Sequence, residues 1–477
     1  MTAIRKCRSL TWPDGTKNRD KILFGAAFLI AFLFLSHPDL WETANHSYVF
    51  LENIFSGNLM NFYEYVAQHN NSYYYINMAN YNIIMYVIFG IWELPIYLFN
   101  QIFHIALNET FLIYWAKLVS VGFFVGCGAM LKKLCENIGL GTNTAAAVAL
   151  FFLFNPIAFF SPMAMGQYDT ICLFFTLWAL SHYVKGNYTK FSFLIGIGVV
   201  CKFFPLLVFV PLILMAEKKI LPLIKYCLIT LWLYLPTTLL FLGRTGNAAA
   251  FTREMIDRMF QLTMNTGFSE VSVFALAYAL LVFISILYKP KTEKAKNYLA
   301  IYVPLAVFGL LFNTIYWHPQ WLVLLIPFIV ATTFMQKNPL PWFYLDIVMA
   351  VGFFMLCFYR FPNQVGGILL DGGLAHHAFG LCVGTSKSRQ SIVYFLNLIP
   401  YLDMLMPVMY TGSIYANIIL KMPLGEKTIA DRLSAGGADG CDKITTKTLW
   451  YTIFAIGFLG AWLMPSILEA LTAFGVI

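Results

Sequence analysis

Charged residues are scarce in this chain. Only 11% of its 477 residues are Asp, Glu, Lys or Arg, whereas 60% are hydrophobic and 17% are aromatic. A water-soluble protein of this length would need many more charged side chains to cover its surface. The composition therefore excludes a soluble enzyme. Because apolar runs close to the length of a bilayer crossing recur along the chain, it predicts a polytopic membrane protein.

The chain also lacks the motifs of soluble cofactor chemistry. It contains no Walker A loop and no Gly-x-Gly-x-x-Gly fingerprint. Its nine cysteines form no Cys-x-x-Cys pair and no Cys/His spacing typical of zinc sites. The net charge of +8 comes from short basic clusters between apolar runs, which is not the pattern of a nucleic-acid-binding surface. We therefore predict no cofactor and no metal, and a divalent cation has no support in the sequence.

The hydropathy pattern predicts an all-α fold with about eleven full membrane spans. Two further apolar stretches are ambiguous: 81–103 is interrupted by Glu93 and Pro95, and 191–215 carries Lys202 at its centre. The basic segment 1–21 leads into the first run without a small-residue cleavage site, so we interpret that run as a retained span. The predicted spans are 22–36, 111–131, 144–163, 168–185, 221–242, 271–288, 298–313, 319–335, 340–358, 391–420 and 447–465.

Basic residues distinguish the possible topologies, because they concentrate on the cytoplasmic side. If 81–103 stays at the outer leaflet and 191–215 is a hairpin of two half-helices, 23 of the 31 Lys and Arg lie inside. If both stretches cross once, 20 lie inside, and this topology is the alternative. The preferred topology gives a long outer loop at 37–110. It also puts Lys202 at the base of an outward-facing pocket, since broken helices at that depth must line a cavity.

Four polar clusters fall on the outer side in this topology. A carboxylate at a membrane edge can act as a general base, and a lysine can bind a phosphate as a point charge. Each cluster also has an ordinary interpretation as a polar helix end, a snorkelling lysine or an aromatic belt. Lys117, near the outer end of its span, could likewise bind a phosphate or simply be a snorkelling lysine. The clusters are Asp39, Glu42 and His46, which share one face of any helix; Gln167 and Asp169; Lys202; and His318 and Gln320.

The order of these clusters resembles the membrane glycosyltransferases of the C superfold. An acidic residue after a retained first span, the G-Q-x-D element in "MGQYDTICLFF" and the K-x-x-P element in "GIGVVCKFFPLLVFVPL" carry the resemblance. The segment "HPQWLVLLIPF" is similar to the late His- or Gln-bearing segment of those enzymes. The chain looks most like the bacterial relatives of the GPI mannosyltransferases, over about residues 20–335.

The resemblance implies an inverting transfer of a hexose, with mannose favoured, from a polyprenyl-phosphate-linked donor to a glycan or lipid-linked acceptor. The reaction would take place at the extracytoplasmic face of a bacterial cell membrane. The implied organisation is a cytoplasmic N-terminus at 1–21, a catalytic membrane module at 22–242 and a variable membrane module at 243–477.

The resemblance also implies roles for single residues. Asp39 would be the base, although many relatives carry a second acidic residue beside the first, so Glu42 is the other candidate. Lys202, and with it Lys117, would hold the donor phosphate. The substrate-binding residues would be His46, Gln167, Asp169, His318 and Gln320.

Two other functions stay open. A transporter or flippase of lipid-linked glycans predicts two pseudo-repeated halves, and the sequence holds no second G-Q-x-D or K-x-x-P element. A polymerase or ligase of such glycans predicts key arginines and a histidine in a large late outer loop. The segment 359–390 has Arg360 and Arg389, with Asp371, His376 and His377.

Overall fold

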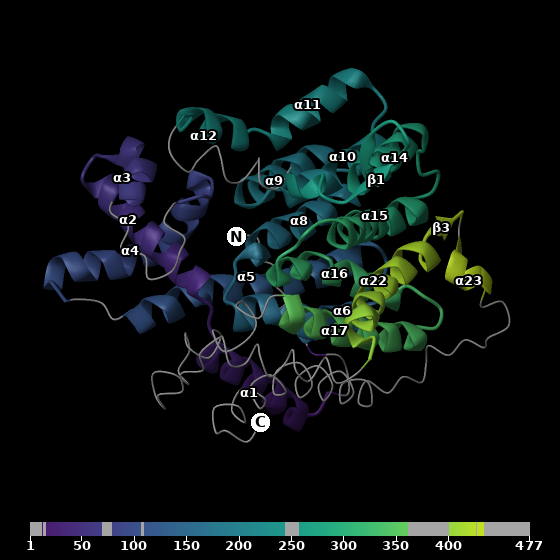
Figure 1. Ribbon diagram of the computed structural model, residues 1–477, viewed down its shortest axis with the longest axis horizontal. Coiled ribbons are helices and arrows are strands. Elements are labelled where there is room, and N and C mark those ends of the chain that lie inside the picture. Colours follow the sequence, from purple (N-terminus) through teal and green to yellow (C-terminus); the bar gives the residue numbers. More distant parts are fainter. Residues whose placement is uncertain are drawn as a thin grey trace, which may run out of the picture.

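The computed structural model describes residues 12, 16–68, 79–105, 109–243, 257–360, 400–425 and 427–433. These residues are mostly helical, and their strands form two short hairpins (Figure 1). The predicted all-α class is confirmed for this part of the chain. The predicted span at 447–465, the first part of the span at 391–420 and the segment with Asp371, His376 and His377 lie outside the described residues.

Several helices have the length and composition of membrane spans. Four single helices are long and apolar enough to cross a membrane: α4 (Ile83–Phe103), α5 (Glu109–Asn137), α15 (Glu293–Thr314) and α17 (Leu340–Arg360). Three bent pairs raise the number to seven: α1 (Asn18–Phe34) with α2 (Pro38–Phe55), α6 (Thr142–Leu153) with residues 156–164, and α11 (Ile220–Thr230) with α12 (Tyr234–Leu240). The described residues thus hold four to seven candidates, whereas eleven spans were predicted for the whole chain, of which 447–465 and part of 391–420 lie outside these residues. One candidate, α4, falls on the stretch 81–103, which the preferred topology placed at the outer leaflet.

Broken helices account for part of this difference. The predicted span 144–163 bends by 58° after α6, where α7 (Pro156–Phe159) and a π-helical segment (Phe160–Ala164) follow. The predicted span 319–335 begins as a 3-10 helix (Pro319–Leu324) before α16 (Ile326–Phe334). In both places a proline lies at the start of the new helix, where it cannot continue the hydrogen bonds of a preceding one.

The predicted outer loop 37–110 is largely helical. It contains α2, a 3-10 turn (Leu59–Asn61), α3 (Phe62–Gln68) and α4, which gather at the left of Figure 1. The His37 Nδ1 caps α2 by accepting the Asp39 N–H at 3.2 Å, and Pro38 occupies the first turn. Gly90 of α4 lets α2 come close, because a Cβ there would lie 3.1 Å from the Phe50 ring. The predicted interruption of 81–103 is absent, since α4 runs through Pro95.

Two short helices occupy the ambiguous stretch 191–215. Helix α9 (Tyr188–Cys201) ends at Lys202. The extended backbone of Lys202 interrupts the helical conformation before α10 (Phe204–Ala216) begins. The two helices run antiparallel, because the rings of Phe191 and Phe209 lie 5.6 Å apart. Gly198 permits the tight return, since a Cβ there would lie 3.1 Å from Pro205 Cγ. Each helix is about 20 Å long, roughly two thirds of the hydrocarbon thickness.

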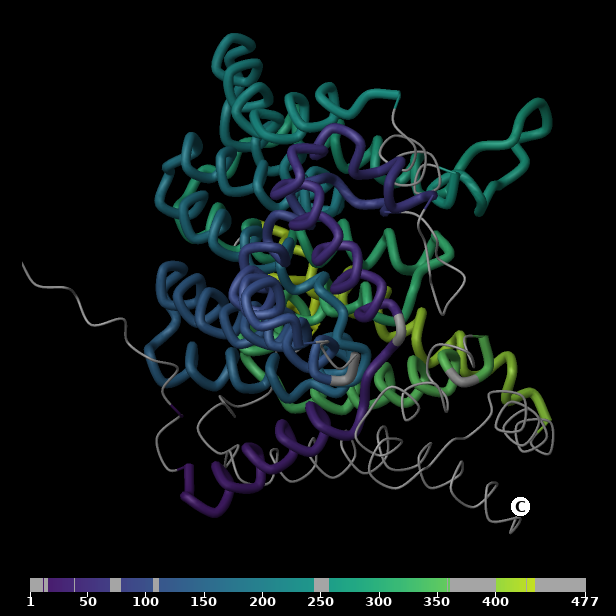
Figure 2. Tube along the Cα trace, turned by 90° about the vertical axis from the view of Figure 1, so that its left-hand side faces the viewer, coloured from purple at the N-terminus to yellow at the C-terminus, as the bar shows by residue number. Residues whose placement is uncertain are grey.

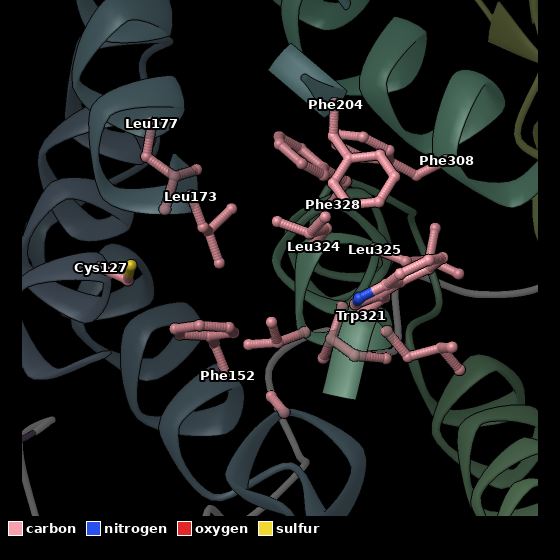
Figure 3. Close-up of a cluster of buried hydrophobic side chains, with 14 of the residues drawn as sticks. Cys127, Phe152, Leu173, Leu177, Phe204, Phe308, Trp321, Leu324, Leu325 and Phe328 are labelled. Atoms are coloured by element: carbon pink, nitrogen blue, oxygen red, sulfur yellow. The ribbon is translucent and has the colours of Figure 1, made fainter. Parts of the chain in front are cut away.

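The hydrophobic core joins the N-terminal and C-terminal halves. Phe152 of α6 and Leu173 of α8 (Asp169–Tyr183) face Phe204, Trp321 and Phe328 across it (Figure 3). The remaining elements are β1 (Thr263–Asn265), β2 (Glu270–Ser272), α14 (Val273–Leu287), α22 (Leu402–Leu420), β3 (Pro423–Leu424), β4 (Lys427–Thr428) and α23 (Ile429–Leu433). Both strand pairs are antiparallel.

Candidate functional site

A sharp turn before α8 carries the centre of the site. Gly166 has φ +66°, a conformation that favours glycine, and a Cβ there would lie 2.6 Å from Leu40 Cδ2. The Gly166 carbonyl accepts the Ser120 hydroxyl of α5 at 2.7 Å. The turn is therefore fixed between α2 and α5, and the next three side chains leave it in different directions.

Gln167 points to the start of α2. Its Nε2 donates to Asp39 Oδ2 at 2.8 Å, and the His37 Nδ1 lies 3.3 Å from Asp39 Oδ1. The Gln167 side chain is buried, whereas the Asp39 side chain keeps 32% of its surface exposed. Asp39 is thus a carboxylate that is held in place on one side and accessible on the other.

Asp169 forms a buried ion pair with Lys202. Asp169 Oδ1 lies 2.6 Å from Lys202 Nζ, and the two side chains are 0% and 6% exposed. Asp169 begins α8 and Lys202 occupies the break between α9 and α10, so the pair ties the apex of the hairpin to the turn. Buried charges need such a partner, because an isolated one would be poorly solvated.

Aromatic rings surround the Lys202 ammonium group. Its Nζ lies 5.9 Å from the ring centroid of Tyr81, 5.8 Å from that of Tyr168 and 5.6 Å from that of Trp321. These separations are within the range of cation–π interactions. The Tyr168 hydroxyl also accepts the Thr43 hydroxyl at 3.0 Å, which adds a second contact between α2 and the turn.

The late polar segment reaches the same place. The His318 ring packs edge-on against Trp321 at 4.9 Å, and Trp321 itself faces the Lys202 ammonium group. Gln320 is buried, and its Oε1 has no hydrogen-bond partner among the described residues. The structure therefore brings Asp39, Gln167, Asp169, Lys202 and His318 together from four separate segments.

No family model, curated protein or solved structure matches this chain.

Glu42 and His46 lie one and two helical turns after Asp39 on α2, and they form a pair of their own. Glu42 Oε2 lies 3.7 Å from His46 Nε2, and both side chains are 5% exposed. The His46 ring stacks edge-on against Tyr86 of α4 at 6.2 Å. Both side chains are thus far less accessible than Asp39, although they lie on the same helix.

Lys117 occupies a different position from the other predicted residues. Its buried Nζ donates to the carbonyl oxygens of Ala31 at 3.2 Å, Phe32 at 2.8 Å and Leu35, at the C-terminal end of α1. A cation is favourable there, because the last carbonyl groups of a helix lack partners and carry negative partial charge. In the structure Lys117 therefore secures the end of α1.

Some residues of the site were not predicted from the sequence. His37 lies two residues before Asp39, and Tyr168 lies between Gln167 and Asp169, so their place in the sequence is the signal that points to them. Arg258, whose guanidinium carbon lies 5.3 Å from the Trp321 ring centroid, gave no such signal because it lies between the predicted spans 221–242 and 271–288, among other charged residues. The described residues contain no group of three His, Cys, Asp or Glu side chains placed to hold a metal ion.

The arrangement has the parts of an acid–base site. Asp39 can accept a proton from a bound hydroxyl group, and Gln167 fixes the orientation of its carboxylate. Lys202 supplies positive charge, and the aromatic rings around it can stack on a sugar or exclude water. The chemistry that these groups allow is transfer to a hydroxyl group with an anionic leaving group.

Proposed function

We propose that this chain is a membrane glycosyltransferase that moves a hexose from a polyprenyl-phosphate-linked donor to a glycan or lipid-linked acceptor. The observation that carries the proposal is the turn 166–169, where Gln167 contacts Asp39 and Asp169 contacts Lys202. The turn thereby contacts a base, Asp39, at one end and a cation, Lys202, at the other. A sugar already activated as a lipid phosphate needs these two groups and orientation, and it needs no nucleotide-binding fold.

In the proposed reaction Asp39 removes the proton from the acceptor hydroxyl group. The hydroxyl oxygen then bonds to the anomeric carbon as the bond from that carbon to the phosphate oxygen breaks, with inversion of configuration. The lipid phosphate leaves with the electron pair, and Lys202 stabilises its charge. Asp169 holds Lys202 in position, and His318 and Gln320 orient the sugar or the acceptor.

Lys117 has a supporting role in this proposal. Its Nζ contacts three carbonyl groups at the end of α1, whereas Lys202 contacts the turn 166–169 through Asp169, so we assign the donor phosphate to Lys202 alone. Asp39 is preferred to Glu42 as the base for a similar reason, because the Glu42 side chain is buried beside His46.

The test is a transfer assay with purified protein in liposomes. The donor is polyprenyl-phosphate mannose, the acceptors are lipid extracts of the source cells, and products are detected by mass. We expect Asp39→Asn to lower kcat by at least about 100-fold, as loss of a general base does. Glu42→Gln is the matched control on the same helix and should keep most of the activity. Full activity of Asp39→Asn, with a monodisperse elution profile, would reject Asp39 as the base.

A further inference from the structure

We propose that the hairpin formed by residues 260–272 is a lipid-binding element that inserts one face into the bilayer leaflet beside the site. This inference rests on the hairpin itself and does not depend on the proposed enzymatic activity. The hairpin contains β1 and β2, joined by a turn in which Thr266 N–H donates to the Ser269 carbonyl at 3.0 Å.

The hairpin has one apolar face and one polar face. Side chains alternate between the two faces of a strand, so Leu262 and Met264 share a face, and Thr263 and Asn265 share the other. The pairing of strands extends this separation, because Met264 lies opposite Val271 and Asn265 lies opposite Glu270. Each face therefore has a uniform character across both strands.

The apolar face is largely exposed in the described part of the chain. Phe260 is 54% exposed, Leu262 47% and Met264 45%, and Phe268 at the tip is 90% exposed. Figure 2 shows the hairpin projecting sideways from the helices, directly after the grey segment at the upper right. An isolated two-stranded hairpin is at best marginally stable in water, so its apolar face needs a covering partner.

The neighbouring helix indicates that this partner is lipid. The hairpin leads directly into α14, which exposes Leu276, Leu280, Phe283 and Leu287 along its length. The apolar face of the hairpin thus continues an apolar helix surface suited to hydrocarbon. A stable protein interface buries about 800 Å² on each partner, more than the few partly exposed side chains of the hairpin present.

The base of the hairpin is tied to the site. Ser272 Oγ donates to the Met259 carbonyl at 2.6 Å, and Met259 is buried. The adjacent Arg258 guanidinium carbon lies 5.3 Å from the Trp321 ring centroid and 5.6 Å from that of Tyr316. Because Trp321 also faces Lys202, insertion of the hairpin would place the site next to the headgroup layer of the leaflet.

Spin labels on single cysteines test the proposal. Leu262, Met264 and Phe268 are each replaced by Cys, with Thr263 and Asn265 as matched controls on the opposite face, in a chain whose other cysteines are Ser. The proteins are reconstituted in phosphatidylcholine and phosphatidylglycerol vesicles. We expect labels at 262, 264 and 268 to be relaxed mainly by oxygen, and labels at 263 and 265 mainly by water-soluble nickel chelate.

Access of nickel chelate to all five positions would overturn the proposal. Labels at 262 and 264 that are protected from nickel chelate only at a low lipid-to-protein ratio would also overturn it. In that case a second copy of the chain, and not lipid, would cover the apolar face of the hairpin. Each variant is first shown to elute as a single species, so that unfolded protein is excluded. Loss of the proposed transferase activity would leave these outcomes unchanged, and the two proposals can therefore fail separately.

Discussion

Three consecutive side chains, Gln167, Tyr168 and Asp169, connect the turn before α8 to two other parts of the chain, α2 and the break between α9 and α10. Gln167 binds Asp39, Tyr168 binds Thr43 and Asp169 binds Lys202. This divergence depends on the left-handed backbone of Gly166 and on its missing Cβ, which leaves room for Leu40. Single residues in this turn therefore determine how three distant segments meet.

The buried pair of Asp169 and Lys202 gives a prediction about stability. Lys202→Met leaves the Asp169 carboxylate without its cation, and we expect a loss of roughly 3–5 kcal/mol, as for other broken buried pairs. Asp169→Asn should cost a similar amount. The double variant should be more stable than the sum of the single losses predicts, because it leaves no uncompensated charge.

The measurement is unfolding of each variant in mild detergent, followed by circular dichroism. An exposed control, Lys185→Met, should change stability little. Additive losses in the double variant would show that the two side chains do not interact, in conflict with their 2.6 Å separation.

The polar residues of the site were predictable because each stands out in apolar surroundings. Polar residues are rare within membrane segments unless they have a function. Lys202 at the centre of 191–215 and the Gln-Tyr-Asp sequence between two apolar runs are residues of this kind. Their partners were not predictable. Nothing in the sequence connects Asp169 to Lys202 rather than to Arg258, because the contact depends on how α8, α9 and α10 pack.

At the scale of helices, the attachment of α1 depends on Lys117. We predict that Lys117→Met destabilises the protein by about 1–3 kcal/mol, because the carbonyl groups of Ala31, Phe32 and Leu35 lose a donor. Protease cleavage between α1 and α2 should become faster, which gel electrophoresis of timed digests will show. Unchanged stability with a higher KM for the donor would instead assign Lys117 to the phosphate.

Apolar content predicted where helices occur, but not where they break. The run 144–163 reads as one span, yet Asn155 accepts the Ile157 N–H at 3.0 Å and starts a new helix there. The stretch 81–103 shows the opposite error, since α4 continues through Pro95. Propensity alone does not decide such cases, because neighbouring helices can satisfy or replace a lost hydrogen bond.

For the whole molecule, the distribution of basic residues predicts that the site faces outward. Tyr316, which is exposed beside the site, and Lys219, just beyond the far end of α10, should therefore lie on opposite sides of the membrane. We expect an impermeant maleimide to label Tyr316→Cys in intact cells and Lys219→Cys only after permeabilisation. All nine native cysteines are replaced by Ser in both variants, so that only the introduced thiol is labelled. Labelling of both positions from the same side would contradict this topology.

The central claim is that the converging polar residues transfer a sugar to an envelope glycan or glycolipid. Mass analysis of these molecules tests it most directly, in source cells that lack the gene and in cells that regain it as the wild type, Asp39→Asn or Glu42→Gln. The account predicts that a species short of one hexose accumulates without the gene and with Asp39→Asn, and that the wild type and Glu42→Gln restore the longer species. Identical glycan masses in all four strains, with the protein present in their membranes, would contradict it.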